Sequence, residues 1–339
     1  MRNALSSLEK TDGVAVTILF PARNEEISIG ETLREYYDHF PLARYVVIDN
    51  NSSDRTACVA AEVFATLCVE GHVIFESRVG KANAIRSALS RFDADIFVMV
   101  DADFTYPAES MRGIVDAMLK FRFDHGVADR LTNQAYVNEP GLRTWLHRAG
   151  NQAFSKLVSR LTQSKFNDVF SGGRVFSQPF VATLQIESDG FQLETELNLH
   201  ASEIDAVTVE QPSRYRNRES GNPSKLSTFA DGWRILCFIA RWAIIRKPDT
   251  LFVLASGLIA VPGVWMAVRL FGLYFERGGV PYPSSAVAAS VLIVASLQLA
   301  LFGIAIKVFR AQQIKTRRSK FARLKREWNS KLDVCAALR

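Results

Sequence analysis

Short apolar runs alternate with segments of helical spacing through the first third of the chain, and this alternation constrains the fold more than any other feature. The apolar runs are residues 14–20, 45–49, 72–76 and 96–100. Runs this short, rich in β-branched residues, are typical of strands buried on both faces of a sheet. Because helical segments separate them, the sequence predicts a parallel α/β sheet with helices on both faces.

Polar clusters follow three of the four predicted strands at the point where each strand ends. They are Arg23, Asn24 and Glu25 after the first strand, residues 49–53 after the second, and Asp101 and Asp103 after the fourth. Ligands of open α/β sheets bind outside the carboxyl ends of the strands. The three clusters therefore predict one ligand site at that edge.

The kind of ligand follows from the paired carboxylates and from the motifs that the sequence lacks. Neither G-x-G-x-x-G after the first strand nor G-x-x-x-x-G-K-[ST] occurs, which argues against a dinucleotide dehydrogenase and a P-loop NTPase. A sheet that binds a nucleotide diphosphate without a glycine-rich loop needs a cation instead. We predict that Asp101 and Asp103 hold Mg²⁺ or Mn²⁺, which in turn holds a diphosphate.

Two long apolar runs, residues 251–268 and 285–306, change the character of the chain in its last third. Each is long enough to cross a hydrocarbon core of about 30 Å as a helix. Lys and Arg residues flank the pair on its outer sides. The positive-inside rule then predicts a two-span protein of the inner or plasma membrane with both termini in the cytosol.

Seven segments, taken in order, resemble one known family. They are PARNEE (21–26), DNNSSDRT (49–56), RVGKANAIRSAL (78–89), DADFTYPAE (101–109), NDVFSGGRVFS (167–177), GFQLETELNLHA (190–201) and SRYRNRESGNPSKLSTFADGWRIL (213–236). The set resembles the GT-A fold, family 2 glycosyltransferases. The later segments are similar to the polyprenyl-phosphate sugar transferases, the group of dolichyl-phosphate mannose synthase and bacterial undecaprenyl-phosphate glucosyltransferases.

The resemblance implies metal-dependent, inverting transfer of a monosaccharide from a nucleotide diphosphate sugar to a polyprenyl phosphate, with UDP favoured over GDP. A phosphate monoester is mostly dianionic at neutral pH, because its second pKa is about 6. Such an acceptor is already a nucleophile. It needs cations that bind and position it rather than a strong general base.

The resemblance also assigns roles to individual residues. The nucleotide-binding set is Pro21, Arg23, Asn24, Glu25, Asp49, Ser52, Lys81 and Asp101. The catalytic set is Asp103, Asp168 and Arg130, and Asp101 with Asp103 forms the metal set. The expected ligands of the acceptor phosphate are Arg130, Arg143, Arg148, Arg174 and Lys225.

Three positions depart from the family pattern. Asn50 stands where the second motif often has an acid, and Thr105 stands where the metal motif often has a glutamine. A hydroxyl is a weaker metal ligand than an amide, so we expect a water to complete the shell. Gly173 replaces a common aromatic residue near the sugar pocket, and the identity of the sugar therefore stays open.

The expected domains follow from these boundaries. They are a cytosolic GT-A catalytic domain at 1–225, interfacial amphipathic helices at 226–248, two transmembrane helices with a short external link at 249–309, and a basic cytosolic tail at 310–339. The tail carries ten Lys and Arg against two Asp and Glu. Since it directly follows an apolar segment, we expect it to meet an anionic membrane surface rather than nucleic acid.

Two other functions stay open at this point. A processive polysaccharide synthase shares this domain, and the segment from Gln211 to Tyr215 has the spacing of its Q-x-x-R-W motif with Tyr for Trp. Two spans are too few to form its pore. A non-catalytic, membrane-anchored protein that binds nucleotide sugars is the other alternative, against which the intact acidic pair argues. The polyprenol type and a homo-oligomeric state are also left open.

Overall fold

The computed structural model describes residues 13–131, 142–162, 166–190, 192–216, 234–239, 241–242, 248–279 and 282–337. The chain divides into two compact units. The first joins Met1–Leu236 with Arg317–Arg339, and the second is Cys237–Thr316. We call the first the sheet unit and the second the apolar unit.

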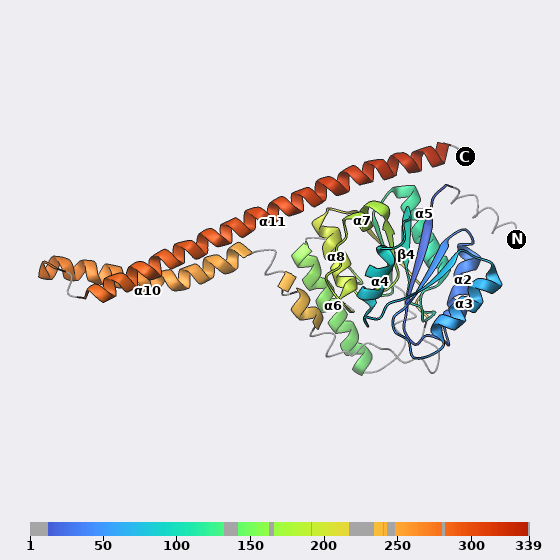
Figure 1. The fold of residues 1–339 in the computed structure, drawn as a ribbon, viewed down its shortest axis with the longest axis horizontal. Helices are drawn as coiled ribbons and strands as arrows, with labels where there is room; N and C mark the ends of the chain where they lie inside the picture. Colours follow the sequence, from blue (N-terminus) through green and yellow to red (C-terminus); the bar gives the residue numbers. More distant parts are fainter. Residues whose placement is uncertain are drawn as a thin grey trace. The chain divides into compact units, whose positions relative to one another are not determined.

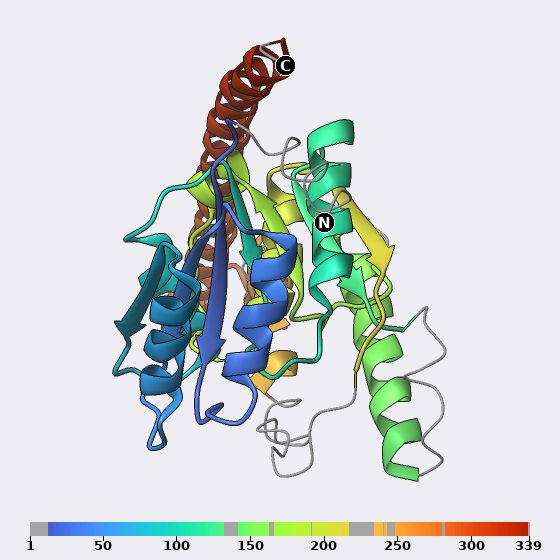
Figure 2. The same ribbon diagram turned by 90° about the vertical axis from the view of Figure 1, so that its right-hand side faces the viewer.

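A seven-stranded mixed sheet forms the centre of the sheet unit, in the order β3-β2-β1-β4-β6-β5-β7. Figure 2 shows the strands side by side from β3 to β7. The strands are β1 (Val16–Ala22), β2 (Arg44–Asp49), β3 (Gly71–Phe75), β4 (Ile96–Met99), β5 (His125–Asp129), β6 (Arg174–Ser177) and β7 (Thr208–Pro212). β6 is antiparallel to both of its neighbours, β4 and β5. The other pairings are parallel.

Helices cover both faces of this sheet (Figure 1). One face carries α2 (Ile29–His39), α3 (Thr56–Leu67) and α5 (Ala108–Phe121), and the other carries α4 (Lys81–Leu89), α7 (Gln178–Thr183) and α8 (Leu193–Glu203). Side chains alternate along β1 as a strand requires. Ile18 and Phe20 belong to the first core, and Leu19 belongs to the second. A further helix, α6 (Leu142–Thr162), precedes β6.

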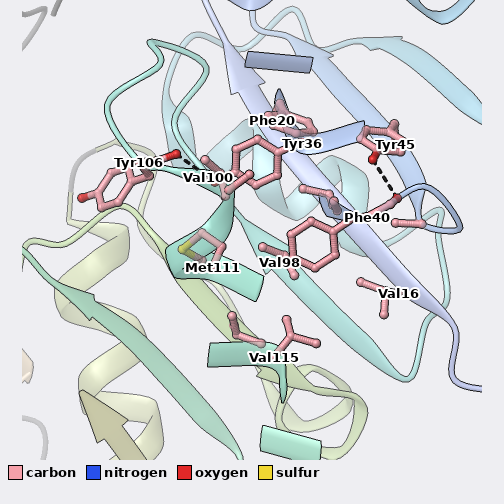
Figure 3. Packing of buried hydrophobic residues seen from close by; sticks show 14 of the residues in the cluster. Val16, Phe20, Tyr36, Phe40, Tyr45, Val98, Val100, Tyr106, Met111 and Val115 are labelled. Atoms are coloured by element: carbon pink, nitrogen blue, oxygen red, sulfur yellow. Dashed lines mark hydrogen bonds between the residues drawn. The ribbon is translucent and has the colours of Figure 1, made fainter. Parts of the chain in front are cut away.

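The core on the α2 side contains buried tyrosines whose hydroxyl groups find partners (Figure 3). Tyr36 packs edge-on against Phe20 and donates a hydrogen bond of 3.1 Å to the Tyr106 carbonyl. Tyr45 donates a hydrogen bond of 2.8 Å to the Phe40 carbonyl. A buried phenol needs such a partner. The Tyr36 bond also ties α2 to the loop that follows β4, which is the loop carrying the acidic pair.

The fold class predicted from the sequence is confirmed, and the four predicted strands lie within two residues of β1 to β4 at each end. The exception to the predicted parallel sheet is β6. Its reversal has a consequence for function, because the start of an antiparallel strand lies at the carboxyl edge of its parallel neighbours. Arg174, the first residue of β6, pairs with Met99 and with Val127. The segment before Arg174 therefore reaches the predicted ligand edge.

The end of the chain differs from the separate basic tail that we expected. Residues from Arg317 onward form the last part of α11 (Pro283–Ala337) and belong to the sheet unit. Phe321, Trp328 and Leu332 are buried in its two cores. The expected membrane-facing charge is thus partly used inside the unit.

Ion pairs fix this helix segment to the amino edge of the sheet. Lys325 Nζ lies 2.6 Å from Asp124, directly before β5, and Lys331 Nζ lies 2.5 Å from Asp95, directly before β4. The Trp328 indole donates to the Asp95 carbonyl at 3.1 Å. This edge is opposite to the one that carries the acidic pair.

The apolar unit contains α10 (Pro248–Arg277) and the earlier part of α11. Both helices are long and apolar enough to cross a membrane, judged by length and composition. Of the predicted interfacial segment, residues 234–239 and 241–242 are helical. The rest of that segment, apart from Pro248, lies outside the described residues.

Candidate active site

The loops at the carboxyl edge of the sheet bring together residues from distant parts of the sequence. Asp49 ends β2, Asp101 follows β4, and Arg130 follows β5. The segment before β6 adds Asp168 and Gly172, because β6 runs in the opposite direction. The three polar clusters predicted from the sequence thus lie at one edge, as expected.

Asp101 is held between a lysine and a glycine. Lys81 Nζ lies 2.5 Å from Asp101 Oδ1 and 2.7 Å from Glu194 Oε1, the latter on α8. Burial alone would lower the pKa of Lys81, but the two carboxylates outweigh burial and raise it. The amine therefore stays charged. On the other side, a Cβ at Gly172 would come 2.2 Å from Asp101 Oδ2, so this position requires glycine.

Asp103 is buried and shaped by its own loop. Thr105 Oγ1 donates to Asp103 Oδ1 at 2.6 Å. The Thr105 hydroxyl, considered from the sequence as a weak metal ligand, therefore orients the carboxylate. Phe104 between them adopts φ 64°, a left-handed conformation that costs energy in a residue other than glycine. The tight turn places both carboxylates of the D-x-D sequence at the end of one strand.

The β1 loop reaches the acidic pair through a serine. Ser28 Oγ lies 3.0 Å from both Glu25 Oε2 and the Ala102 carbonyl. The Glu25 backbone N–H also donates to Thr56 Oγ1 at 2.8 Å. Glu25, predicted at the nucleoside, is thus buried between the loop after β2 and the loop that carries Asp101 and Asp103.

The remaining predicted nucleoside residues form the neighbouring part of the edge. Asp49 is 8% exposed and accepts a hydrogen bond from the Ser52 N–H at 3.0 Å. Ser52 Oγ in turn accepts from the Asn24 N–H at 3.1 Å. Pro21 lies in β1 opposite Ile48, and Arg23 is exposed at the same edge. The structure brings all of these together.

Asn50 has a role that explains its departure from the family pattern. Its amide nitrogen donates to the carbonyls of Glu76 and Arg78 at 3.3 and 2.7 Å, and its oxygen accepts from the Gly80 N–H at 2.6 Å. A carboxylate could not make the two donations. Asn50 therefore fixes the loop that leads into Lys81.

Arg130 and Asp168 form a bidentate pair. Arg130 Nε and Nη2 lie 2.7 and 2.8 Å from the two oxygens of Asp168, which is fully buried. The guanidinium group also lies over the Tyr215 ring, 5.5 Å from its centroid. The pair with Asp168 is made by Nε and Nη2 of Arg130 and does not involve Nη1.

Arg174 does not belong with the acceptor residues, contrary to the sequence prediction. It is fully buried and donates to the carbonyls of Ser171 and Val169 and to Asn198 Oδ1, at 2.8–2.9 Å. Its Nη1 also lies 3.1 Å from His125 Nε2. These partners hold the segment before β6, so the role of Arg174 is structural.

The other three predicted acceptor residues are Arg143, Arg148 and Lys225. Arg143 and Arg148 lie on the first turns of α6, where only the backbone is described, and Lys225 lies outside the described residues.

Two residues at this edge were missed by the sequence analysis. Glu194 binds Lys81, and Tyr106 OH accepts a hydrogen bond of 2.7 Å from the Gly172 N–H. Gly173 packs so closely on Tyr106 that a Cβ would lie 2.6 Å from the ring. The two consecutive glycines after Ser171 are the sequence signal for the contact with Tyr106. Glycine in or next to a strand often marks a place where another group comes close to the backbone.

The donor set can be tested against the predicted cation. The described residues contain no group of three or more His, Cys, Asp or Glu side chains that could hold a metal. Two carboxylates, Asp101 and Asp103, stand at the end of β4. Mg²⁺ characteristically binds through one or two carboxylates, waters and substrate phosphates. The residues therefore fit a cation that a diphosphate helps to bind.

The fold and this edge define a GT-A type α/β protein, and comparison with known proteins identifies the family. The model of glycosyl transferase family 2 matches residues 17–182. The chain therefore belongs to glycosyl transferase family 2, as the motifs predicted.

The relatives extend beyond the matched region. Glycosyltransferase AglJ of Haloferax volcanii is 28% identical over 296 residues, which cover 87% of this chain and 91% of that protein. The dolichyl-phosphate hexose transferase of the same organism is 28% identical over 218 residues, or 64% and 89% of the two chains. The UDP complex of glucosyl-3-phosphoglycerate synthase from Mycobacterium tuberculosis shares the fold, with TM-score 0.51, 18% identity, and coverage of 69% and 81%.

Proposed function

We propose that this glycosyltransferase moves a monosaccharide from a nucleotide diphosphate sugar to a polyprenyl phosphate at the cytosolic face of a membrane. The observation that carries the proposal is the arrangement around the acidic pair. Asp101 and Asp103 stand between the Asp49 side of the edge and the Arg130–Asp168 pair. Two apolar helices follow in the same chain.

The donor occupies the Asp49 side in this proposal. Asp49 accepts an N–H of the base, with uracil favoured over guanine, and Lys81 faces the phosphates. Mg²⁺ or Mn²⁺ on Asp101 and Asp103 supplies charge stabilisation for the leaving diphosphate. The similarity to the UDP complex of glucosyl-3-phosphoglycerate synthase supports the fold of the donor-binding part of the sheet unit.

The acceptor phosphate approaches from the Arg130 side. One of its oxygens forms a bond to the anomeric carbon while the bond from that carbon to the diphosphate breaks, which inverts the configuration. No proton has to be removed from a phosphate dianion, so no general base is required. Arg130 positions the anion, and Asp168 holds Arg130 in place. Arg143, Arg148 and Lys225 are further proposed ligands of this phosphate.

The membrane placement rests on α10 and α11. The proposal puts both helices across the bilayer, the link between them outside, and both termini in the cytosol. In a variant without its native cysteines, a membrane-impermeant thiol reagent applied from outside should label Gly279→Cys and not Ser319→Cys. Labelling of Ser319→Cys in intact cells would contradict this topology.

The experiment that tests the function is lipid-dependent release of nucleoside diphosphate from a panel of nucleotide sugars. Undecaprenyl phosphate and dolichyl phosphate should stimulate release, and the product should be a lipid-linked monosaccharide. A long polymer would favour the processive synthase, and binding without release would favour the non-catalytic protein. Full rates in excess EDTA would contradict the metal. The names of relatives that use dolichyl phosphate support this choice of acceptor.

A further inference from the structure

Lys81 contacts two carboxylates that come from opposite parts of the site. Asp101 follows β4, and Glu194 lies on the first turn of α8. The 2.7 Å distance to Glu194 is that of a charge-assisted hydrogen bond, and the 2.5 Å distance to Asp101 is shorter still. The lysine and glutamate side chains are 10% and 5% exposed. The amine is therefore largely shielded from water, so the loss of either carboxylate would leave a buried charge with one partner fewer.

The two oxygens of Asp101 have different neighbours. Oδ2 is the oxygen nearer to Gly172, where an added Cβ would lie 2.2 Å from Oδ2 and 2.9 Å from Oδ1, and Oδ1 accepts the Lys81 hydrogen bond. A divalent cation that binds Asp101 therefore arrives next to a fixed positive charge on the same carboxylate. The Lys81 ammonium repels a second cation on the same carboxylate, and this repulsion is stronger than in water because the amine is buried. Asp101 therefore binds a divalent cation more readily when Lys81 is held away from it.

Glu194 is the group that can keep Lys81 when this happens. We propose that Glu194 is a positioning residue that holds the Lys81 amine while a divalent cation takes Asp101, and so turns the amine towards the diphosphate of the donor. The inference rests on the metal role proposed above. It gives Glu194 a specific task in loading the donor, although Glu194 itself touches neither cation nor substrate.

The inference predicts how divalent cation affinity depends on both residues. In Glu194→Gln, Lys81 keeps Asp101 as its charged partner, so it competes more strongly with the cation. Affinity for Mn²⁺ should fall about tenfold. In Lys81→Met, the competitor is gone, and the affinity should not fall. In the double variant, the Glu194→Gln effect should shrink to about twofold, because there is no lysine left to hold.

The measurement is titration of Mn²⁺ into the full-length protein in detergent, followed by electron paramagnetic resonance of the free ion. It requires no turnover. Glu196→Gln is the matched control, because Glu196 lies on the same helix and accepts from Glu187 N and Ser188 rather than from Lys81. It should leave Mn²⁺ affinity unchanged. Should Glu194→Gln fail to fold, Glu194→Asp keeps the charge, draws it away from Lys81, and should still weaken Mn²⁺ binding.

The outcomes separate this inference from the proposed function. An equal loss of affinity from Glu194→Gln with and without Lys81 would mean that Glu194 acts through its charge alone, and the inference would be wrong while the metal role stood. Undiminished affinity in both Glu194 variants would also overturn it. Wild-type protein that binds no Mn²⁺ with or without UDP would overturn the metal role itself, and the inference with it.

Discussion

Gly172 packs directly on the Asp101 carboxylate, so closely that a Cβ at this position would lie 2.2 Å from Oδ2 and 2.8 Å from Cγ. Its backbone N–H is held in turn by the Tyr106 hydroxyl. The glycine segment before β6 therefore forms one wall of the acidic site. It fixes where the carboxylate can point.

Gly172→Ala should damage activity more than stability. The added methyl group forces the Asp101 carboxylate to rotate, and displacement of a reacting group by about 1 Å can cost roughly 100-fold in rate. We expect kcat to fall by roughly 10- to 100-fold with a weaker response to Mn²⁺, measured by nucleoside diphosphate release. Gly113→Ala is the control, because a Cβ there meets nothing within 4 Å. Equal kinetics of the two variants would contradict the steric argument.

Asn50→Asp should destabilise the protein although it exchanges a single heavy atom. The new carboxylate would face the carbonyls of Glu76 and Arg78 and lose two donations, which costs about 1–3 kcal/mol for a buried group. Thermal unfolding measures the cost. Asn51→Asp provides a neighbouring control, because Asn51 is exposed and its φ of 59° suits Asp as well as Asn. A melting temperature as low in the control as in Asn50→Asp would refute the assignment.

The strands were predictable because their signal is local. An apolar run of strand length indicates burial on both faces of a sheet. This signal predicts both ends of β2 and of β4 to within one residue. The reversal of β6 was not predictable in this way. Its four residues, Arg174–Ser177, carry the same apolar pattern in either direction. Only pairing with β4 and β5, far away in the sequence, decides the direction.

The roles of site residues were predictable where a sequence motif contains them. They were not predictable where the role depends on which distant residue the charged group pairs with. Asp101 was found because carboxylates at a strand end are costly without a cation. The sequence places Arg174 with the acceptor phosphate because it lies in the segment expected to form the acceptor side, yet its partners are carbonyls, Asn198 and His125. The basic end of α11 was assigned to a membrane. The buried Asp124 that pairs with Lys325 lies 201 residues earlier.

A test of Arg130 has to separate its role towards the lipid from its ion pair with Asp168. Arg130→Ala removes the proposed acceptor cation and also leaves a fully buried carboxylate without its guanidinium partner. Breaking a buried pair costs about 3–5 kcal/mol. We expect a loss of roughly 10- to 150-fold in kcat/KM for the lipid, since a charge-assisted bond is worth about 1.5–3 kcal/mol, together with a lower melting temperature.

A paired variant separates the two effects. Arg130→Met with Asp168→Asn should recover the melting temperature and not the use of lipid, because the buried charge is gone but so is the cation. Arg130→Lys should recover lipid use only in part, since an ammonium group cannot reproduce the guanidinium fork. Nucleotide binding, titrated alongside, should stay near wild type in all three. Full recovery of lipid kinetics in the double variant would exclude Arg130 as an acceptor ligand.

The sheet unit should lose stability in mild acid through two buried histidines. Burial lowers the pKa of His200 to about 4, and burial together with the Arg174 guanidinium lowers the pKa of His125 well below its usual range. His125 Nε2 must accept from Arg174, so protonation would break this contact. In the unfolded chain these histidines bind protons below about pH 6.5, whereas in the folded protein they stay neutral to a lower pH. The contribution of the two histidines to stability is therefore largest above about pH 6.5 and falls as the pH drops below it.

The size of this effect is bounded by linkage. Each histidine contributes up to about 1.4 kcal/mol per pH unit between its unfolded and folded pKa values. His200→Gln should flatten the dependence of the melting temperature between pH 7.5 and 5.5. Comparison with wild type cancels the buried carboxyl groups, which both proteins share. An identical pH dependence in the two proteins would show that His200 does not contribute.

Lys325 should stabilise the sheet unit from a position that the sequence suggested was a membrane-facing tail. Asp124 is fully buried, and its Oδ2 accepts from Lys325 Nζ at 2.6 Å and from the Val207 N–H at 2.9 Å. Burial raises the pKa of Asp124, and Lys325 opposes this. Lys325→Met leaves a buried carboxylate without its cation, which costs about 3–5 kcal/mol at neutral pH.

The cost should depend on charge and not on the loss of the lysine stem. It should shrink as the pH falls, because a protonated Asp124 needs no cation, and Lys325→Met with Asp124→Asn should recover most of the melting temperature at neutral pH. Arg323→Met on the same helix is the control, since its pair with Glu327 is exposed and is worth less than about 1 kcal/mol. If Lys325→Met and Arg323→Met melt alike, the end of α11 does not secure the sheet unit through this pair.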